Sequence, residues 1–287
     1  MTQEQQLLFK QYIKSDCNRL DFIQDFLYKN DLESVVLPID GKNHLYVKFP
    51  ANQYNPLFKI KTVINHYDRV EDSPGANDNS FANFCMLLWA VKLVKLPFQH
   101  NIRLIFTDGE ELGKDGISAQ GSYGLAQLYK KLSILKDDIF VFDSIGRGTV
   151  PVVCEPVFSK ASKEFLKKYE ELENKAIGVV RTAANGKWFK LPAGLSDNAG
   201  FIANGLPAVA ITMLPSEEIE RYVNKLMGLK NPSYDYIRTA KDMEDFIPKT
   251  WRMFHTEEDN FENLDVRSYS VVENILEKLT LLKSLAK

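Results

Sequence analysis

The sequence predicts an α/β fold, a three-layer α/β/α sandwich around a mixed, mostly parallel central sheet. Short runs of β-branched and aromatic residues alternate with longer segments that carry apolar residues at helical spacing, which is the order expected when helices join parallel strands. Near the N-terminus, two such runs are separated only by Asp40-Gly41-Lys42-Asn43, which favours an antiparallel hairpin at one edge of the sheet. We expect residues 1–287 to form a single domain.

Periodicity assigns the individual elements in chain order. Residues 3–29 carry a helical apolar stripe that breaks near Ser15-Asp16, so one long or two short helices are expected. A helix is also expected to open at Asn79 or Ser80. Further helices are expected at residues 84–96, 118–131, 159–175 and 266–285, and strands at residues 35–39, 45–49, 58–65, 102–106, 139–142 and 208–213. Residues 181–200 are mostly loop by composition.

One stretch is long for a connection between two elements. Residues 215–249 are charged and rich in tyrosine, and loops of this length are usually functional or disordered. We therefore predict a lid or pocket insertion at residues 215–250, within which Glu217 to Leu229 can form a helix. Five aromatic side chains could line a specificity pocket, although core or lid packing is the ordinary explanation for each: Trp188, Phe201, Tyr234, Tyr236 and Trp251.

Composition excludes several classes of protein. The net charge is -2 without a long basic run, so neither nucleic acid nor an anionic membrane surface is an expected partner. The N-terminal residues form a charged amphipathic pattern, and we expect neither a signal peptide nor a membrane-spanning segment. Cys17, Cys85 and Cys154 are scattered without metal-type spacing. Sparse cysteines in a chain without an export signal predict reduced thiols and a cytoplasmic location.

Residues able to bind metals or move protons follow the predicted strands or open the predicted helices. Each alone has an ordinary explanation, since a lone histidine is usually a structural hydrogen bonder and an acidic pair is usually a solvated turn. Together they would meet outside the carboxyl ends of the strands, and clustered carboxylates repel one another unless cations neutralise them. This conflict predicts a two-metal centre at the sheet edge, built from His66, Asp68, Asp78, Glu110, Glu111, Asp143 and His255.

The order of five motifs resembles peptidase family M28, the zinc metallopeptidases related to bacterial leucyl aminopeptidase. The motifs are H-x-D at 66–68, G-A-N-D at 75–78, D-G-E-E-L-G at 108–113, an aspartate after a strand at 143, and H-T-x-x-D at 255–259. The resemblance implies the zinc-exopeptidase fold and two zinc ions per chain. It implies that Asp78 bridges the ions, that His66 and Asp143 hold one of them, and that Glu111 and His255 hold the other.

The resemblance also implies roles for two further carboxylates. Glu110 would be the general base that takes a proton from a water shared by the ions, and Asp68 would orient the ring of His66. Adjacent side chains on an extended segment point in opposite directions, which would let Glu111 face a metal while Glu110 faces the water. Asn198 stands where many relatives have histidine; it could donate a hydrogen bond to an oxyanion but could not carry a proton.

The implied activity is that of an aminopeptidase, which hydrolyses the N-terminal residue from a peptide substrate. Zinc suits a mixed set of histidine and carboxylate ligands, although cobalt or manganese would also fit. Two alternatives stay open: a glutaminyl-peptide cyclotransferase that works with one zinc ion, and a binding protein that keeps the fold without turnover. The preferred substrate residue also stays open, as does the oligomeric state, for which a homo-oligomer is one option.

Overall fold

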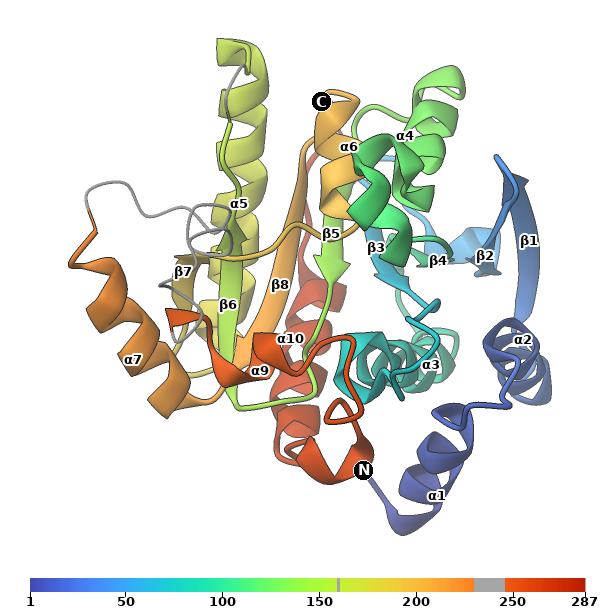
Figure 1. Ribbon diagram of the computed structural model, residues 1–287. Coiled ribbons are helices and arrows are strands. Elements are labelled where there is room, and N and C mark those ends of the chain that lie inside the picture. The colour runs from blue at the N-terminus through green and yellow to red at the C-terminus, as the bar shows by residue number, and fades with distance from the viewer. Residues whose placement is uncertain (159–160, 230–245, 287) are drawn as a thin grey trace.

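The computed structural model describes residues 1–158, 161–229 and 246–286. An eight-stranded sheet runs through the molecule, and helices cover both of its faces (Figure 1). The strands are β1 (Glu33–Ile39), β2 (Lys42–Lys48), β3 (Lys61–His66), β4 (Ile102–Thr107), β5 (Asp138–Phe142), β6 (Val150–Glu155), β7 (Phe189–Pro192) and β8 (Ala208–Leu214). The helices are α1 (Gln3–Tyr12), α2 (Arg19–Lys29), α3 (Phe81–Leu93), α4 (Gly121–Lys131), α5 (Lys163–Ala183), α6 (Asn198–Ala203), α7 (Ser216–Leu226), α9 (Lys249–Arg252) and α10 (Ser268–Leu281).

The expected mixed, mostly parallel sheet is confirmed. Its strand order is β1-β2-β4-β3-β5-β8-β6-β7. In the centre, β4, β3, β5 and β8 form a parallel block. The predicted hairpin of β1 and β2 is antiparallel and flanks this block on one side, while β6 runs antiparallel to β8 on the other. The carboxyl ends of the four central strands therefore share one edge of the sheet, where ligands usually bind in open α/β folds.

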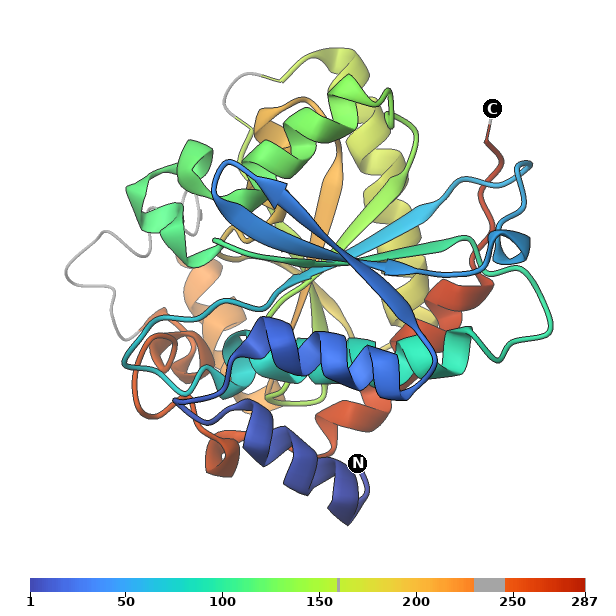
Figure 2. The same cartoon turned by 90° about the vertical axis from the view of Figure 1, so that its right-hand side faces the viewer.

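Two apolar cores, one on each face, hold the helices to the sheet. Helices α3, α5 and α10 pack on one face with α1 and α2 outside α3, and α4, α6 and α7 pack on the other (Figure 2). All six residues of β3 are buried, as expected for a strand covered on both faces. Val63 belongs to the first core and Ile64 to the second, because successive side chains of a strand point to opposite faces.

The prediction that residues 181–200 are mostly loop is wrong at both ends and in the middle. Helix α5 continues to Ala183, because its buried stripe extends through Val179 and Val180. Strand β7 has only four residues at the sheet edge, which is too short for a periodicity signal. The sequence does not predict strand β6, because Pro151 interrupts its apolar run and proline argues against a central strand. In the structure Pro151 lies opposite Met213 of β8.

The insertion at 215–250 is described in part. It begins with α7, which matches the predicted helix and buries Ile219, Tyr222 and Leu226, and it ends with α9. Tyr234 and Tyr236 lie outside the described residues, and the lid stays a prediction. Among the described helices, none combines the length and apolar character needed to cross a membrane.

Two of the aromatic residues considered for the pocket belong to the core. Phe201 is fully buried with its ring centroid 5.5 Å from that of Tyr129, and Trp251 is buried with its centroid 5.4 Å from that of Tyr222. Trp188 is half-buried and packs against the first core. The ordinary explanation, core packing, therefore applies to Phe201 and Trp251.

Candidate metal centre

His66 is the last residue of β3, and its side chain is fully buried at the edge where the parallel strands end. Its Nε2 atom lies 3.2 Å from Oδ1 of Asp78 and 3.7 Å from Oδ1 of Asp143, while Nδ1 lies 3.5 Å from Oδ1 of Asp68. Neither ring nitrogen has a hydrogen-bond partner of good geometry among the described residues. A buried imidazole nitrogen that faces two carboxylates without bonding to either is what a metal ligand requires.

The segment between β3 and α3 presents Asp78. Gly75 adopts a φ of +58°, and a Cβ atom there would lie 2.7 Å from the carbonyl oxygen of Asp78, so this turn needs glycine. The backbone amides of Asn77 and Asp78 donate to Oδ1 and Oδ2 of Asp259 at 2.7 and 3.0 Å. The Asp259 carboxylate thereby fixes the backbone on which Asp78 stands.

Side-chain amides tie the same segment to the end of β5. Asn79 donates through Nδ2 to the carbonyl of Phe142 at 2.8 Å, and its Oδ1 accepts from the amide of Ser144 at 3.2 Å. Asp143 lies between these two anchored residues. The two hydrogen bonds of Asn79 therefore hold the backbone of Asp143 close to that of Asp78.

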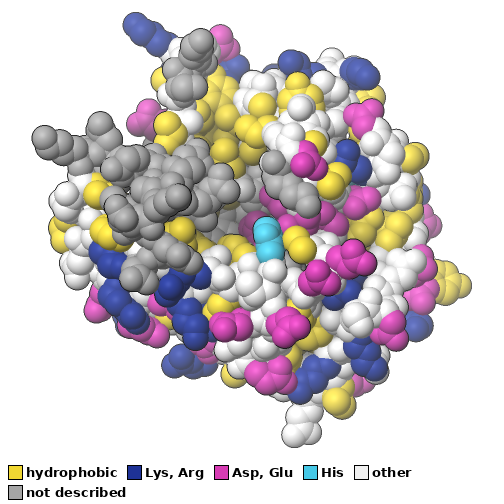
Figure 3. All heavy atoms as spheres, in the orientation of Figure 1, with side chains coloured by type: hydrophobic (Ala, Val, Ile, Leu, Met, Phe, Trp, Pro, Cys, Tyr) yellow, Lys and Arg dark blue, Asp and Glu magenta, His cyan; other side chains and the backbone are white. Residues whose placement is uncertain are grey.

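His255 approaches Asp78 from the other side. Its Nε2 atom lies 2.8 Å from Oε2 of Glu111 and 3.4 Å from Oδ2 of Asp78. The His255 side chain is 54% exposed, whereas the other three histidines of the chain are buried, and Figure 3 shows a histidine at the surface beside acidic side chains. His255 also has a φ of +62°, a conformation that is uncommon outside glycine and that concentrates at functional sites.

The five predicted ligands form two groups that share Asp78. One group contains His66, Asp78 and Asp143, the other contains Asp78, Glu111 and His255, and within each group the ligand atoms all lie within 4.8 Å of one another. Oδ1 of Asp78 faces the first group and Oδ2 faces the second. One carboxylate that offers an oxygen to each of two such groups suits a bridged pair of cations, and histidine with carboxylate is a donor set that zinc accepts. The residues present thus fit two ions.

Asp68 contacts more than the ring of His66. Its Oδ1 and Oδ2 atoms accept hydrogen bonds from the amides of Glu110 and Glu111 at 3.2 and 3.1 Å. The expectation of an extended backbone at these two acids is wrong. Glu110 has helical angles (φ -66°, ψ -44°) and opens a 3₁₀ helix, Glu111–Asp115. Successive side chains of a 3₁₀ helix diverge by about 120°, so the two carboxylates still point to different places.

Glu110 belongs to neither ligand group. Gln120 donates through Nε2 to Oε1 of Glu110 at 2.9 Å and to its carbonyl oxygen at 3.3 Å. Desolvation by the surrounding protein raises the pKa of Glu110 well above its ordinary value, and the charges of Asp143 and Asp197 add to the effect. A carboxyl group with a raised pKa beside two ligand groups is suited to accept and return a proton.

Two protonated histidines balance the carboxylates of the metal-free site. Burial would lower the pKa of His66, but contacts with three aspartates outweigh it and hold that pKa well above its usual value. Contacts with Asp78 and Glu111 raise the pKa of His255 to about 10. The pKa of Asp78 lies well below its usual range, because the two histidines outweigh the effect of burial. The carboxylates of each group therefore favour the protonated form of its histidine when no metal is bound.

Three residues near the site had no role assigned from the sequence. Asp197 is fully buried, accepts a hydrogen bond from Thr107 at 2.5 Å, and has a pKa raised to about 6 by burial. Asp259 lies in the H-T-x-x-D motif, which could have marked it, whereas no motif marks Gln120. Asn198 is fully buried and its Oδ1 accepts from the amide of Ser196 at 2.9 Å, and its role towards an oxyanion stays a prediction.

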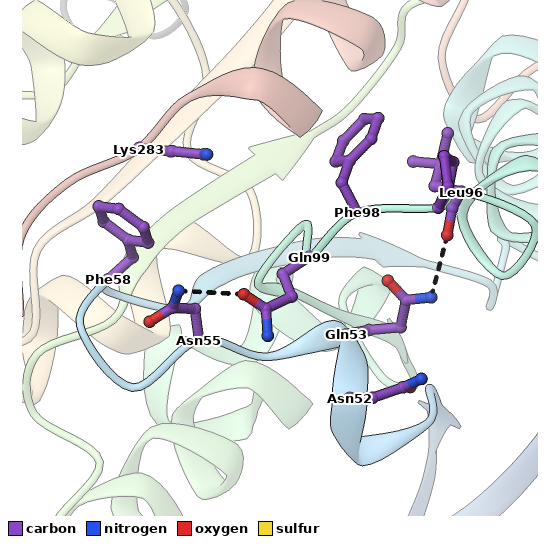
Figure 4. Close-up of a pocket in the computed structure, with 9 residues that line it drawn as sticks. Asn52, Gln53, Asn55, Phe58, Leu96, Phe98, Gln99 and Lys283 are labelled. Carbon is purple, nitrogen blue, oxygen red and sulfur yellow. Dashed lines mark hydrogen bonds between the residues drawn. The ribbon is translucent and has the colours of Figure 1, made fainter.

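A pocket of about 490 Å³ lies at the opposite edge of the sheet, where β3 and β4 begin (Figure 4). Carboxamides, aromatic rings and Lys283 line it, and its lining residues include neither a histidine nor a carboxylate. It is therefore separate from the two ligand groups and offers none of the chemistry predicted for them.

Comparison with known proteins identifies the class. The model of Peptidase family M28 matches residues 49–280, and the chain therefore belongs to this family. Aminopeptidase YwaD of Bacillus subtilis (strain 168) is 30% identical over 170 residues, which are 58% of this chain and 34% of that protein. The chain thus spans about a third of the length of this curated relative.

Solved structures share the fold at low sequence identity. The LapA aminopeptidase of Legionella pneumophila aligns with a TM-score of 0.66 at 14% identity, covering 99% of this chain and 71% of that one. BSAP, a zinc aminopeptidase from Bacillus subtilis, aligns with a TM-score of 0.53 at 19% identity, covering 83% and 49%. A glutaminyl cyclase from an Acidobacteriales bacterium aligns with a TM-score of 0.59 at 16% identity, covering 97% and 93%.

Proposed function

We propose that this chain is a zinc-dependent exopeptidase that removes N-terminal residues from peptides and works with two zinc ions. The observation that carries the proposal is the pair of ligand groups that share Asp78. Membership of family M28 supports peptidase chemistry. Similarity to proteins described as aminopeptidases, one of them a zinc enzyme, supports the direction of cleavage and the metal.

The ligands divide between the ions as the two groups do. His66 and Asp143 would hold one ion, Glu111 and His255 would hold the other, and Asp78 would contribute a carboxylate oxygen to each set. When bound, a pair of divalent cations lowers the pKa of a shared water to about 7 and polarises the scissile carbonyl. The amides of Glu110 and Glu111 donate to Asp68, whose Oδ1 lies 3.5 Å from Nδ1 of His66, so one carboxylate contacts both acids and the ring.

Glu110 acts as the general base. It accepts the proton of the attacking water and delivers it to the leaving amine, and the raised pKa makes the carboxylate a stronger base for the first of these transfers. Gln120 holds Oε1 of the carboxylate, which leaves the second oxygen to receive the proton. A positioned acid–base group of this kind contributes about 10²–10⁴-fold to the rate.

A glutaminyl-peptide cyclotransferase is the second candidate. A glutaminyl cyclase shares the fold over nearly the full length of both chains. Five ligand residues in two groups favour the hydrolase, because cyclisation with one zinc ion would leave one group unused. A binding protein without turnover is disfavoured by Glu110, since a carboxyl group desolvated next to the ligands has no structural partner other than Gln120 among the hydrogen bonds of the described residues.

The test compares wild-type protein with Glu110→Gln after zinc loading. Substrates are aminoacyl anilides with free and with acetylated amines, free dipeptides, and peptides beginning with glutamine. We expect two zinc ions per wild-type chain and cleavage of the anilides with free amines only. Glu110→Gln should keep the zinc and lose at least about 10²-fold in kcat, while Glu164→Gln, a change on the exposed face of α5, should behave as wild type.

Three outcomes would contradict the proposal in different ways. Wild-type turnover by Glu110→Gln would remove Glu110 from the reaction. One zinc ion per chain with release of cyclised glutamine would establish the second candidate. A chain loaded with two zinc ions and inert towards every substrate would establish the binding protein.

A further inference from the structure

The first 48 residues lie outside the part of the chain that matches the family model, yet they touch the segments that carry or follow three of the proposed ligands, His66, Asp78 and His255. Helix α1 places the ring of Phe9 against Phe81 and Phe84 of α3, with centroids 6.2 and 5.5 Å apart. The same ring lies 6.0 Å from that of Phe261, shortly after His255 and Asp259. Figure 2 shows α1 and α2 outside α3.

Arg19, the first residue of α2, makes the most direct connection. Its side chain is buried, with 5% of the residue exposed. Nη1 donates to the carbonyl oxygens of Tyr67 and Asp68 at 3.0 and 3.3 Å. Nη2 donates to the carbonyl oxygen of Pro74 at 3.0 Å and to Oγ of Ser80 at 2.8 Å. One guanidinium therefore joins both ends of the 67–80 segment.

The 67–80 segment is shaped to receive this guanidinium. A Cβ atom at Gly75 would lie 3.2 Å from Nη2 of Arg19, so a larger residue would crowd the arginine. Oγ of Ser80 donates onward to the carbonyl oxygen of Gly75 at 2.5 Å, which links the turn to the same network. The ring of Tyr12 lies 5.3 Å from Cζ of Arg19 and supports the guanidinium from the side of α1.

A second arginine makes the reverse connection. Arg69, within the 67–80 segment, donates to the carbonyl oxygens of Ile13 and Ser15 at 3.3 and 2.9 Å, in the turn between α1 and α2. The 67–80 segment and the N-terminal helices are thus joined in both directions. Residues 67–75 lie outside every helix and strand, so the donors of Arg19 pair carbonyl oxygens that a regular element would otherwise satisfy.

The chemistry of the contacts calls for arginine in particular. The four acceptors lie at two separate places, and a planar guanidinium presents donors to both at once. Lysine carries its donors on a single nitrogen and would reach one place only. A buried guanidinium without these acceptors would be strongly unfavourable, so the segment and the arginine fix each other.

We infer that Arg19 is a positioning residue for the metal centre, and that the N-terminal helices α1 and α2 form part of the machinery that holds Asp68 and Asp78 in place. The effect on zinc rests on the function proposed above, whereas the effect on the order of the 67–80 segment does not. Groups that orient metal ligands typically change metal affinity about 10–100-fold when removed. We expect Arg19 to act in this range.

The test uses Arg19→Met, which keeps the apolar stem and removes the donors, and Arg19→Lys, which keeps the charge. Lys61→Met is the matched control, because Lys61 is also buried and donates to two carbonyl oxygens, those of Thr280 and Leu282, at 3.1 and 2.5 Å, at the opposite end of β3. Zinc affinity is measured by competition with a chelator, kcat and KM by anilide cleavage, and the order of residues 67–80 by hydrogen exchange of the metal-free protein.

We expect Arg19→Met to bind zinc about 10–100-fold more weakly, to lose kcat with little change in KM, and to exchange faster at residues 67–80. Arg19→Lys should show zinc affinity, kcat and exchange rates between those of Arg19→Met and wild type. If Arg19→Met does not fold, the same three measurements on Arg19→Lys test the role of Arg19. Lys61→Met should lower the melting temperature without changing zinc affinity or exchange at 67–80.

Two results would overturn the inference. One is zinc affinity within threefold of wild type together with unchanged exchange in the Arg19 variants. The other is an equal loss of zinc affinity in Lys61→Met, which would show that general destabilisation is the cause. If the wild-type protein binds no zinc, the proposed function fails, and hydrogen exchange of the metal-free variants still tests the role of Arg19.

Discussion

Zinc binding should displace protons from the two histidines of the metal centre, and the structure indicates how many. In the metal-free protein the pKa of His66 lies well above its usual value and the pKa of His255 is about 10, so both rings carry a proton at pH 7. A histidine must be neutral to bind a metal. Each ring therefore loses one proton, and loading of both ligand groups releases about two protons from histidine.

This proton release makes zinc affinity depend on pH in a defined direction. While the ring remains protonated in the metal-free protein, each displaced proton raises the apparent association constant about tenfold per pH unit. The gain for the group that contains His255 continues up to pH values near 10, where that ring deprotonates without help from zinc. Zinc should therefore bind more tightly at pH 8 than at pH 7 in both groups.

Isothermal titration calorimetry in buffers of different ionisation enthalpy measures the number of protons released when zinc binds. The observed heat varies with the ionisation enthalpy of the buffer in proportion to that number. We expect His255→Gln to release about one proton fewer than wild type. His100→Gln is the matched control, since burial lowers the pKa of His100 to about 4 and that ring is already neutral at pH 7. Zinc binding without proton release, or an equal change in both variants, would refute the reasoning.

Three further predictions concern residues around the centre. Asp259→Asn should leave a buried amide of Asn77 or Asp78 without an acceptor, which should lower the free energy of unfolding by about 1–3 kcal/mol. Zinc binding, measured by competition with a chelator, should also weaken. Unchanged stability and zinc affinity would contradict this prediction. Gln120→Leu removes a hydrogen-bond donor to the charged form of Glu110, so the pKa of Glu110 should rise further. The acidic limb of the plot of kcat against pH should then move to higher pH. If that limb does not move, Gln120 does not influence the general base. In the metal-free protein the raised pKa of His255 contributes stability that is complete below about pH 6.5 and is lost as pH rises towards 10. If the melting temperature falls over this pH range by as much in His255→Gln as in wild type, His255 is not the cause.

The strand-end residues could be predicted because simple physics places them. His66 and Asp143 each close an apolar run, and parallel strands bring their carboxyl ends to one edge whatever the loops do. Asp78 could be predicted because it stands between the same strand and the next helix, three residues before Phe81 opens α3. The clustering of these acids with histidine then follows from the strand order, which is a property of the whole sheet.

The supporting residues could not be predicted, because their contacts are long-range and leave no local pattern. Arg19 reaches acceptors 48 to 61 positions away in the sequence, and at the start of a helix it reads as an ordinary surface residue. Gln120 stands in a polar stretch without a motif. The backbone at Glu110 was expected to be extended, whereas the hydrogen bonds that Asp68 accepts there accompany a 3₁₀ turn.

Strands β6 and β7 show that local patterns have the same limit in predicting the fold. β7 has four residues and only half of them are buried, so neither length nor alternation distinguishes it from loop. β6 is buried at five of its six positions, but its proline counts against a strand in any reading of local propensity. Strand β6 forms because β8 offers it an edge, and β7 forms because β6 then offers the next edge, which is tertiary information.

Two cations should occupy the two ligand groups, with Asp78 shared between the groups. Diffraction from crystals of the zinc-loaded protein, measured at the zinc absorption edge, locates the ions. We expect two anomalous peaks per chain, one among His66, Asp78 and Asp143 and one among Asp78, Glu111 and His255. No peak at these positions, or zinc bound elsewhere on the chain, would contradict the account.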